Sequence, residues 1–400
     1  MTGWIHMIGL VLLGIACIGV LSSLSFLLLA LLGAAKFHRD NQEQRRFAEK
    51  NVSLPAVSIL KPVHGAEPRL KENIESFFRQ DYPDYEILFA ADDEDDAALN
   101  VVREVASRYP QIKSSILVTG KPALPNPPAC SFARMTEVAA HHILVTSDSD
   151  VEVGPNYLRE VVAPTLESAV GMVTCVYRGK NAGGFWSGMD AIGMSVEMTA
   201  GVLTANLLEG MKFGLGPTIV TRKDSIAKIG GYGVTGEYFS NDFVTGNFIE
   251  RAGYRVVLSR HVIDHVVPPM TFKRMWQRQV RWAKGTRWSR PKGHLGTGLI
   301  FAMPYGILGV IAGALTGHFA FGAILLLVAT CNRLLESWVV GWGAVRDPRA
   351  RQVWLYPLRD LLGFAVWCAS YLSKSAVWRD HRFRLVEGGR IVLREEGEEV

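Results

Sequence analysis

The sequence predicts an α/β domain built on a parallel β-sheet, with transmembrane helices at both ends of the chain. Two uncharged, mainly apolar stretches, residues 7–35 and 293–332, flank a middle region in which apolar strands alternate with helices. The apolar fraction of the 400 residues is 48%, and the mean hydropathy is +0.14. These values suit a chain that is part soluble domain and part membrane segment.

The first apolar stretch predicts a transmembrane anchor over residues 1–36. Residues 8–32 are nearly all apolar and exceed the roughly 20 residues that a helix needs to cross a bilayer. Residues 1–6 carry no Lys or Arg, which disfavours a cleaved signal peptide. Basic residues follow the anchor and, by the positive-inside rule, place the next domain in the cytosol: Lys36, Arg39, Arg45 and Arg46.

The second apolar stretch predicts C-terminal membrane helices over residues 297–378. Residues 293–332 are long enough for two crossings with a break near residues 313–317. Arg346, Arg349 and Arg351 follow, so a hairpin that returns to the cytosol fits the charge rule.

A last apolar segment, residues 361–373, is shorter than the roughly 20 residues that a transmembrane helix needs. Segments of this length are more often interfacial or re-entrant. Arg379, Arg382 and Arg384 argue against an exported tail, so we expect residues 379–400 to form a cytosolic tail.

Charge and cysteine content exclude several other classes of protein. The formal net charge of +5 is too small to predict a nucleic-acid partner. The five cysteines contain no Cys-x-x-Cys pair, so neither a disulfide framework nor a zinc site is indicated. Nothing in the sequence predicts an oligomeric state.

The middle region, residues 50–268, predicts repeated strand–helix units. Strands are expected at residues 56–62, 85–91, 114–119 and 142–147, and helices at residues 69–79, 97–108 and 131–140. Such an alternation of apolar runs with helices indicates a parallel sheet that is buried on both faces. Ligands of such sheets bind beyond the carboxyl ends of the strands.

Acidic residues follow two of these strands. Residues 92–96 are all acidic, which is typical of a solvated loop, although Asp92 or Asp93 could also accept hydrogen bonds from a nucleotide base or ribose. Asp148 and Asp150 follow the strand at residues 142–147, and carboxylates in this spacing can hold Mg²⁺ or Mn²⁺. Such a cation would neutralise charge that builds on a leaving diphosphate.

A third acid opens a helix expected at residues 243–252. Asp242 follows Ser240 and Asn241, and any of the three could cap that helix. The alternative is a catalytic base that takes the proton of an acceptor hydroxyl.

A basic and aromatic helix is expected within residues 269–296. Arg278, Arg281 and Trp282 belong to a segment in which cations alternate with tryptophans, which is typical of a membrane interface or of a nucleic-acid patch. The tryptophans and the adjoining membrane hairpin favour the interface, and an Arg of this helix could also reach a diphosphate. Residues 185–208 predict either a buried helix or a methionine-lined lipid slot.

In chain order, Asp93, the Asp148-x-Asp150 pair, Asp242 and Arg278-x-x-Arg281-Trp282 resemble the ceramide glucosyltransferase family, in a bacterial form. Further segments that look like this family are residues 58–62, 76–83, 221–224 and 378–384. The resemblance covers nearly the whole chain. It implies an inverting lipid glycosyltransferase with a GT-A fold, a Rossmann-like catalytic domain.

The resemblance also implies roles for individual residues. Lys61, Pro62, Asp92 and Asp93 would bind the UDP-sugar donor, with Asp93 on the uridine side and Asp92 as the near alternative. Asp148 and Asp150 would hold the metal and the donor, and Asp242 would be the base. Arg278, Arg281 and Trp282 would close over the diphosphate.

The chain departs from the family pattern at two places. Asn126-Pro127-Pro128 stands where the family usually has Asn-Pro-Lys, which removes a cation near the phosphates and leaves Lys121 or Arg134 as substitutes. Asn241-Asp242 carries one carboxylate where the family often has two. Both departures bear on rate and donor choice.

The expected activity is therefore transfer of a hexose, glucose first, from a UDP-sugar to the hydroxyl of a membrane lipid such as ceramide. Alternatives are transfer to a hopanoid or other lipid, also from UDP-N-acetylglucosamine, a processive polysaccharide synthase, and a non-catalytic membrane scaffold. We expect an integral membrane protein with its catalytic domain on the cytoplasmic face, at a bacterial inner membrane.

Overall fold

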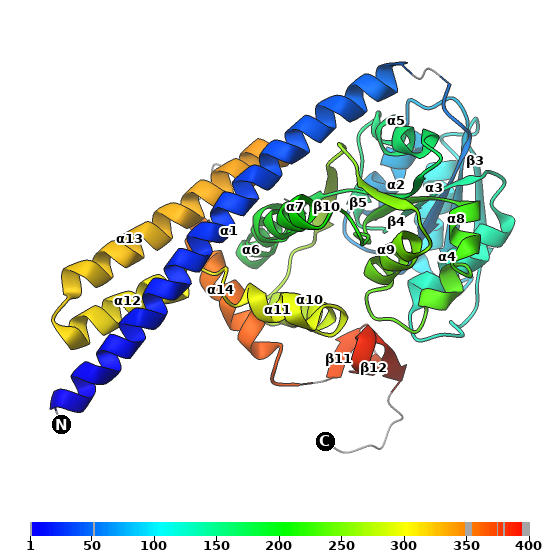
Figure 1. The fold of residues 1–400 in the computed structure, drawn as a ribbon. Coiled ribbons are helices and arrows are strands. Elements are labelled where there is room, and N and C mark those ends of the chain that lie inside the picture. Colours follow the sequence, from blue (N-terminus) through cyan, green and yellow to red (C-terminus); the bar gives the residue numbers. More distant parts are fainter. Residues whose placement is uncertain (1, 51–52, 349–353, 374, 379–380, 394–400) are drawn as a thin grey trace. The chain divides into compact units, whose positions relative to one another are not determined.

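The computed structural model describes residues 2–50, 53–348, 354–373, 375–378 and 381–393 (Figure 1). The chain divides into two compact units. The helical unit comprises Met1–His38, Gly188–Leu208 and Met270–Lys374. The sheet unit comprises Arg39–Ser187, Glu209–Pro269 and Ser375–Val400.

A seven-stranded sheet in the order β3-β2-β1-β4-β8-β6-β9 forms the centre of the sheet unit. Its strands are β1 (Val57–Pro62), β2 (Tyr85–Ala91), β3 (Lys113–Val118), β4 (Ile143–Ser147), β6 (Val170–Thr174), β8 (Thr218–Arg222) and β9 (Arg255–Leu258). The four expected strands are confirmed as β1 to β4, and all four run parallel. The sheet is not wholly parallel, because β8 runs antiparallel to β4 and β6. A buried strand has the same apolar pattern in either direction, so the sequence did not reveal this reversal.

Helices pack on this sheet, and their ends follow from local chemistry. They are α2 (Leu70–Phe78), α3 (Ala97–Ala106), α4 (Pro127–Val138), α5 (Tyr157–Val162), α8 (Lys223–Lys228) and α9 (Asn241–Arg251), with short helical turns η1 (Ala163–Leu166) and η3 (Tyr232–Thr235). The side chains of Asp96 and Asn126 accept backbone hydrogen bonds at the N-termini of α3 and α4. Ile59, Ile87 and Phe77 belong to the core between sheet and helices and have no exposed surface.

Two smaller sheets complete the sheet unit. One has the order β5 (Val151–Glu152), β10 (Ile263–Val267), β7 (Tyr177–Asn181). The other joins β11 (Ser375–Trp378), β12 (His381–Leu385) and β13 (Ile391–Leu393), with a short turn η6 (Glu387–Gly389) before β13. Part of the segment expected as a tail therefore forms strands, while Arg379 and residues 394–400 lie outside the described residues.

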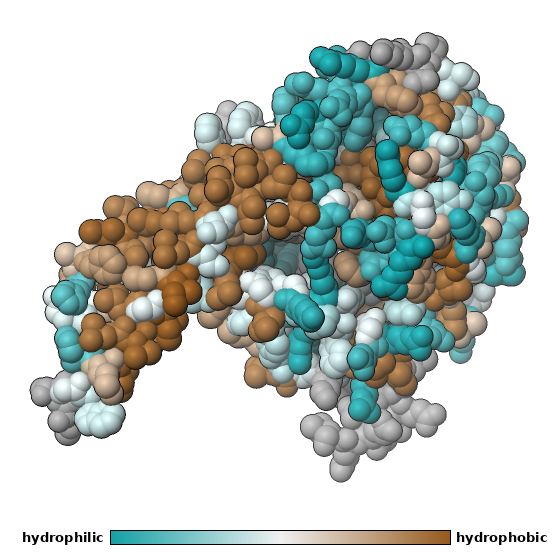
Figure 2. All heavy atoms as spheres, in the orientation of Figure 1, coloured by the Kyte–Doolittle hydropathy of each residue, from teal (hydrophilic) through white to brown (hydrophobic). Residues whose placement is uncertain are grey.

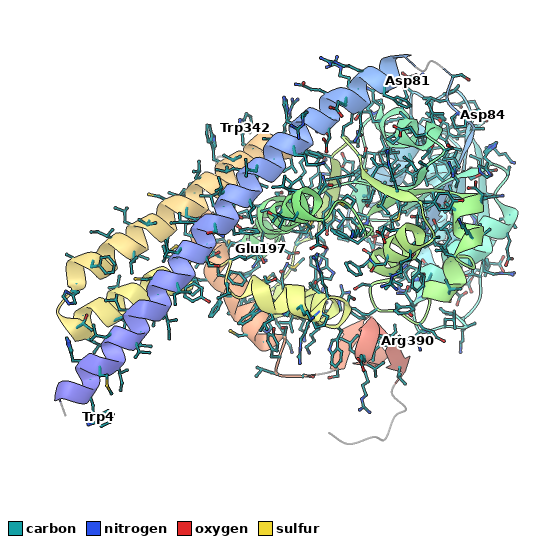
Figure 3. All side chains as sticks on the ribbon, viewed as in Figure 1. Trp4, Asp81, Asp84, Glu197, Trp342 and Arg390 are labelled. Atoms are coloured by element: carbon teal, nitrogen blue, oxygen red, sulfur yellow. The ribbon has the colours of Figure 1, made fainter. Side chains whose placement is uncertain are left out.

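The helical unit contains most of the long apolar helices. It contains the first part of α1 (Thr2–Lys50) and the part of α6 (Phe185–Ile192) that starts at Gly188. Its other elements are η2 (Gly193–Met198), α7 (Thr199–Leu208), α10 (Phe272–Ser289), α11 (Pro291–Thr297), α12 (Met303–Thr316), α13 (Phe319–Glu336), η4 (Ser337–Ala344) and α14 (Tyr356–Ala369). Figure 2 shows hydrophobic side chains gathered over α1 and α13. Within the unit, Trp4 near the start of α1 and Trp342 in η4 are exposed (Figure 3), as is typical of tryptophans at a membrane interface.

Three helices in the described part of the chain are long and apolar enough to cross a membrane: Gly3–Ala48, Phe185–Leu208 and Phe319–Ala344. The expected break near residues 313–317 is confirmed at Gly317, whose φ of 79° ends α12. With 14 residues, α12 is shorter than a full crossing, and residues 298–302 separate it from the short helix α11. From the sequence, residues 185–208 were expected to form a buried helix or a lipid slot, and their being long enough to cross a membrane was not predicted.

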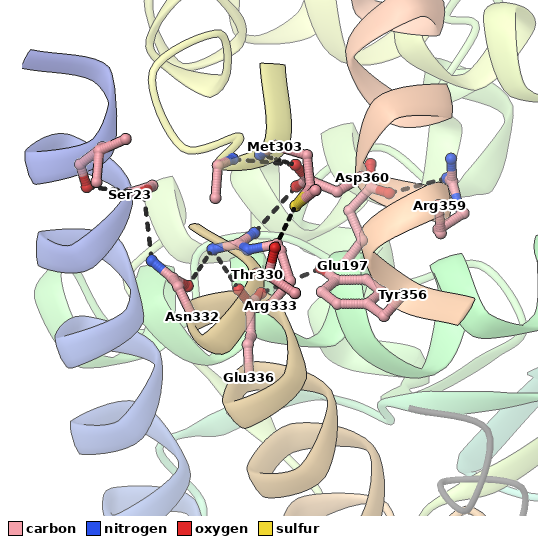
Figure 4. A network of polar contacts seen from close by, with 12 residues as sticks. Ser23, Glu197, Met303, Thr330, Asn332, Arg333, Glu336, Tyr356, Arg359 and Asp360 are labelled. Carbon is pink, nitrogen blue, oxygen red and sulfur yellow. Dashed lines mark hydrogen bonds and ion pairs between the residues drawn. The ribbon is translucent and has the colours of Figure 1, made fainter. Parts of the chain in front are cut away.

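Buried charges join the apolar helices α12, α13 and α14 of the helical unit (Figure 4). The guanidinium group of Arg333 lies 3.2 Å from Asp360 and 2.7 Å from Glu336. The other oxygen of Asp360 accepts hydrogen bonds from the N–H groups of Ala302 and Met303 at the start of α12. Asp360 therefore satisfies both a cation and a helix N-terminus in apolar surroundings.

Candidate active site

The candidate site lies at one edge of the central sheet, where β1, β2 and β4 end. Because these strands are parallel, their carboxyl ends lie at the same edge. Lys61 and Pro62 end β1, Asp92 follows β2, and Asp148 follows β4. Three segments that are far apart in the sequence are thereby brought to one place.

Residues 148–150, called here the acid loop, are held by side chains from several elements. The ammonium group of Lys61 donates to the carbonyl oxygen of Asp148 over 2.6 Å. The amide of Asn73 on α2 donates to the carbonyl oxygen of Ser149 over 3.1 Å. His265 on β10 lies 3.2 Å from a carboxylate oxygen of Asp150. The first two contacts hold the backbone of the acid loop, and the third orients the carboxylate of Asp150.

The electrostatics of the acid loop are dominated by burial and by like charges. Burial and the neighbouring Asp150 raise the pKa of Asp148 from 3.8 to about 7, although the cation of Lys61 opposes the rise. The charge of Asp242 also raises the pKa of Asp148, so this third acid is within electrostatic range. Burial in turn lowers the pKa of Lys61 from 10.5 to about 7. Burial and the neighbouring like charges therefore make the ionised form of Asp148 costly unless a cation is bound beside it.

The acid loop fits a divalent cation that is shared with a diphosphate. Oxygen Oδ1 of Asp150 is buried and has no hydrogen-bond partner, which leaves it able to bind a ligand. Among the described residues no group of three or more His, Cys, Asp or Glu side chains could hold a metal by itself. Mg²⁺ is commonly held by one or two carboxylates together with substrate phosphates, and these two acids match that pattern.

Asp242 lies in the first turn of α9. Its Oδ2 accepts a hydrogen bond from the N–H of Gly216 over 2.7 Å. A side chain at Gly216 would come within 3.1 Å of the same oxygen, so glycine allows this close approach. Burial raises the pKa of Asp242, and hydrogen bonds from the N–H groups of Phe243 and Gly216 offset part of the rise. A carboxylate with a raised pKa is a stronger base than an exposed one.

The acidic run after β2 divides into different local roles. Asp92 is half-buried, and the hydroxyl group of Thr119 donates to it over 3.4 Å. Asp93 is exposed, and its Oδ1 accepts from the N–H of Asp95 in a local turn. Asp96 caps α3 and also accepts from the N–H of Gly65. Of the two residues considered for nucleoside contact, Asp92 directly follows β2 and is the less exposed.

Arg278, Arg281 and Trp282 lie on α10 in the helical unit. The guanidinium carbon of Arg278 lies 4.5 Å from the ring centre of Trp282, and its Nε lies 3.6 Å from Asp190 on α6. Gln279 also contacts Asp190 through a short hydrogen bond. Burial and the nearby charge of Arg278 lower the pKa of Arg281 to about 10. The motif is thus a connected cluster that Asp190 ties to α6.

The two departures from the family pattern have simple local structures. Pro127 and Pro128 occupy the first turn of α4, where a missing N–H costs nothing. Of the suggested substitutes for the lost cation, Arg134 pairs with Glu137 over 2.9 Å and Lys121 is exposed. Among the described residues, no hydrogen bond or ion pair joins either substitute to the acid loop.

Sequence reasoning missed several residues that hold the site. Asn73, His265 and Gly216 make contacts that fix the acids or the acid loop. Asn126 was noted only as part of the Asn126-Pro127-Pro128 segment, and its contact with the loop before Asp242 was not predicted. Each of them depends on a partner far away in the chain, and no local spacing marks such a pair. The signal was weak even in principle, because a lone Asn or His is common in any α/β domain.

Residues 17–391 match the sequence profile of glycosyl transferase family 21. The chain belongs to this family. Among curated relatives, ceramide glucosyltransferase 1 of Caenorhabditis elegans is 25% identical over 86% of this chain and 74% of its own length. Ceramide glucosyltransferase 3 of the same organism is 24% identical over 86% and 76%. The expected kinship with ceramide glucosyltransferases is confirmed.

Solved structures with a similar chain path include a mannosyltransferase of Pyrobaculum calidifontis in complex with GDP-Man and Mn²⁺. It is 16% identical, with a TM-score of 0.47, over 88% of this chain and 98% of that chain. TarS of S. aureus, solved with UDP-GlcNAc, is 14% identical with a TM-score of 0.40, over 86% and 98%.

Family membership and the observed sheet together establish the fold and the enzyme class of this family 21 protein. It has the expected GT-A fold, an α/β domain accompanied by membrane-length helices. It is a glycosyltransferase that uses a nucleotide-sugar, and it is associated with a membrane.

Proposed function

We propose that this family 21 protein transfers glucose from UDP-glucose to the primary hydroxyl of ceramide or a closely related membrane lipid, with inversion at the sugar carbon. The carrying observation is that Asp148, at the carboxyl end of β4, lies within electrostatic range of both Asp150 and Asp242. The donor and acceptor are proposed from the names of the relatives, both ceramide glucosyltransferases. The membrane-length helices support a lipid acceptor.

In the proposed reaction the lipid hydroxyl oxygen attacks the anomeric carbon of the sugar from the side opposite the diphosphate. One carbon–oxygen bond forms, and the bond between the anomeric carbon and the β-phosphate oxygen breaks. Asp242 takes the proton of the attacking hydroxyl, and UDP leaves with the bonding electron pair. Because a single displacement occurs, the configuration at the anomeric carbon inverts.

Asp242 is suited to the role of base by its surroundings. Gly216 engages one of its carboxylate oxygens, which orients the group at the start of α9. Burial raises its pKa toward the working pH, which improves proton transfer. The carboxylate can return its proton to solvent after the product leaves.

The donor end of the site would be built from the acid loop and the ends of β1 and β2. Asp148 and Asp150 would hold Mg²⁺ or Mn²⁺, and the cation would offset the charge that builds on the leaving diphosphate. Lys61 orders the loop through the carbonyl oxygen of Asp148, and Pro62 and Asp92 would border the nucleoside. Arg278, Arg281 and Trp282 would close over the diphosphate, which is the role that the family resemblance implies for them.

The cytoplasmic face is the proposed location of the reaction. Lys36 and Arg39 follow the most apolar part of α1, and the positive-inside rule favours the cytosol for what comes next. UDP-sugars are soluble anions, so a site on the cytosolic side would have direct access to them.

The test uses the full-length protein in nanodiscs with ceramide, Mn²⁺ and labelled UDP-glucose, with product identified by mass. We expect glucosylceramide from the wild type and a loss of about 1,000-fold or more in Asp242→Asn, because the base is removed. Asp84→Asn is the matched control, since Asp84 is exposed beside the amino end of β2 (Figure 3). Normal turnover by Asp242→Asn would refute the role of base. Product only with a hopanoid or glycerolipid, or only with UDP-N-acetylglucosamine, would refute the proposed substrates.

A further inference from the structure

The loop that leads into α9 is fixed from two sides by distant parts of the sheet unit. Residues 236–240 connect η3 to α9 and end two residues before Asp242. On one side lies the N-terminus of α4, and on the other lies the chain around β13. Both contacts belong to the sheet unit.

Asn126 provides the first contact. Its side chain has no exposed surface, and its amide donates to the carbonyl oxygen of Tyr238 over 2.8 Å and to that of Phe239 over 3.5 Å. Its own N–H donates to the carbonyl oxygen of Gly236 over 2.9 Å. The side-chain oxygen is occupied separately, since it accepts from the N–H of Ala129 as the cap of α4. One buried side chain therefore caps the N-terminus of α4 and also holds the loop before α9.

Residues 389–391 provide the second contact. The N–H of Phe239 donates to the carbonyl oxygen of Gly389 over 2.9 Å, and the N–H of Ile391 donates to that of Glu237 over 2.8 Å. Between these two bonds, Tyr238 and Arg390 form an antiparallel bridge. Figure 3 labels Arg390, which directly precedes β13 of the C-terminal sheet (β11, β12 and β13), and its Nε lies 3.4 Å from the hydroxyl oxygen of Tyr238.

The loop is thus fixed at three consecutive residues, 237–239, and Asp242 follows within one helical turn. A buried donor that loses its acceptor costs free energy, so the loop has one favoured path. The start of α9 inherits that path, and with it the direction of the Asp242 carboxylate toward Gly216. Displacing a catalytic group by about 1 Å can lower turnover about 100-fold.

We infer that Asn126 and residues 389–391 are positioning elements for Asp242: together they set the loop that places the base. The inference rests on the proposed role of Asp242. It assigns a function to Asn126 that does not require contact with either substrate. It also makes the C-terminal sheet part of the catalytic unit, although no residue of that sheet is proposed to touch the donor.

Two variants of the full-length enzyme separate the contacts. Asn126→Asp keeps the oxygen that caps α4 and replaces the amide donor with an acceptor that opposes the carbonyl oxygens of residues 238 and 239. Ending the chain after Val386 removes both hydrogen bonds made by residues 389–391. Ending it after Leu393 is the matched control, because those bonds remain.

We expect kcat to fall about 100-fold in Asn126→Asp and in the protein ending at Val386, with the KM for UDP-glucose changed less than about twofold. The control ending at Leu393 should match the wild type. Titration with UDP and Mn²⁺ reports whether the donor site is intact. A purely structural role would lower the active fraction and UDP binding in parallel, whereas a positioning role lowers kcat alone.

The outcomes distinguish this inference from the proposed function. Inactive Asp242→Asn with near-normal kcat in both test variants would keep the base and overturn the positioning elements. Active Asp242→Asn would overturn both proposals. If Asn126→Asp does not fold, the protein ending at Val386 decides alone. Loss of UDP binding in both variants would also overturn the inference, because the contacts would then support the whole fold.

Discussion

The ammonium group of Lys61 lies beneath the acid loop, 2.6 Å from the carbonyl oxygen of Asp148 and 3.8 Å from the ring centre of Phe77. This cation at the end of β1 thereby binds the backbone of the loop and the face of an aromatic ring. Its charge still acts on the nearby carboxylates, since it lowers the pKa of Asp148. Lys61 is therefore both a support of the acid loop and its counter-charge.

Replacing Lys61 by Met should move the acidic limit of activity to higher pH. Without the cation the pKa of Asp148 rises further, and a protonated Asp148 cannot hold a divalent cation. We expect a shift of about one pH unit in the acidic limb of the Mn²⁺-dependent rate. Lys71→Met on the exposed face of α2 is the control. An unchanged acidic limb would show that Lys61 does not tune Asp148.

Stabilisation of the protein by metal and UDP should depend on pH. The pKa of Asp148 is raised from 3.8 to about 7, so the folded protein retains a proton that the unfolded chain releases in this window. Stability contributed by this group is therefore present below pH 4 and is lost as pH rises toward 7. A bound cation restores it, so Mn²⁺ with UDP should raise Tm more at pH 8 than at pH 5.5. Asp148→Asn should abolish the difference, and an equal rise at both pH values in wild type would contradict it.

Asp92 and Asp93 should differ in their effect on donor binding. Asp92→Asn alters a half-buried carboxylate at the edge of the sheet and should raise the KM for the UDP-sugar about tenfold. Asp93→Asn alters an exposed residue whose oxygen only closes a local turn, and it should change KM less than about twofold. Steady-state kinetics with varied donor separates the two. The reverse order would return the nucleoside contact to Asp93.

Removal of Arg333 should destabilise the helical unit. Arg333→Ala leaves Glu336 and Asp360 without their shared cation in apolar surroundings, with an expected loss of about 3–5 kcal/mol in the free energy of unfolding. Thermal unfolding in detergent measures the loss. Leu335→Ala, at an exposed position of the same helix, is the control. The triple variant Arg333→Met, Glu336→Gln, Asp360→Asn should recover part of the stability, and no recovery would mean that the charges act independently.

Trp282 should act through Arg278. The ring of Trp282 lies against the guanidinium group, so Trp282→Ala frees Arg278 while Trp282→Phe keeps an aromatic face. We expect Trp282→Ala to lower kcat/KM about 30-fold and Trp282→Phe to lower it less than about fivefold. Equal losses would indicate that Trp282 acts by another route, such as contact with the acceptor.

The first half of the sheet could be predicted from the sequence because its signals are local. The strands β1, β2 and β4 are mainly apolar and buried runs, while β3 is apolar only in its second half, and each helix between these strands has its own spacing. Asp148 and Asp150 were placed correctly at a strand end for the same reason. The direction of β8 could not be predicted, since it depends on pairing with β4 and β6.

The supports of the site could not be predicted because they are long-range. Nothing near Asn126 in the sequence indicates a bond to Tyr238, which lies 112 residues away. The same holds for His265 beside Asp150 and for Arg333 beside Asp360. Sequence patterns identify groups that carry chemistry more readily than groups that hold them.

The pairing of residues 237–239 with residues 389–391 has a consequence for biosynthesis. In the part of the chain that the structure describes, the three helices long enough to cross a membrane lie between residues 3 and 344, so the ribosome makes them before it makes Gly389. A nascent chain that has not reached residue 389 lacks the contacts that residues 389–391 make with the loop before Asp242. We therefore expect the newly made protein to acquire full turnover only after its hydrophobic segments have entered the bilayer, where its lipid partner resides.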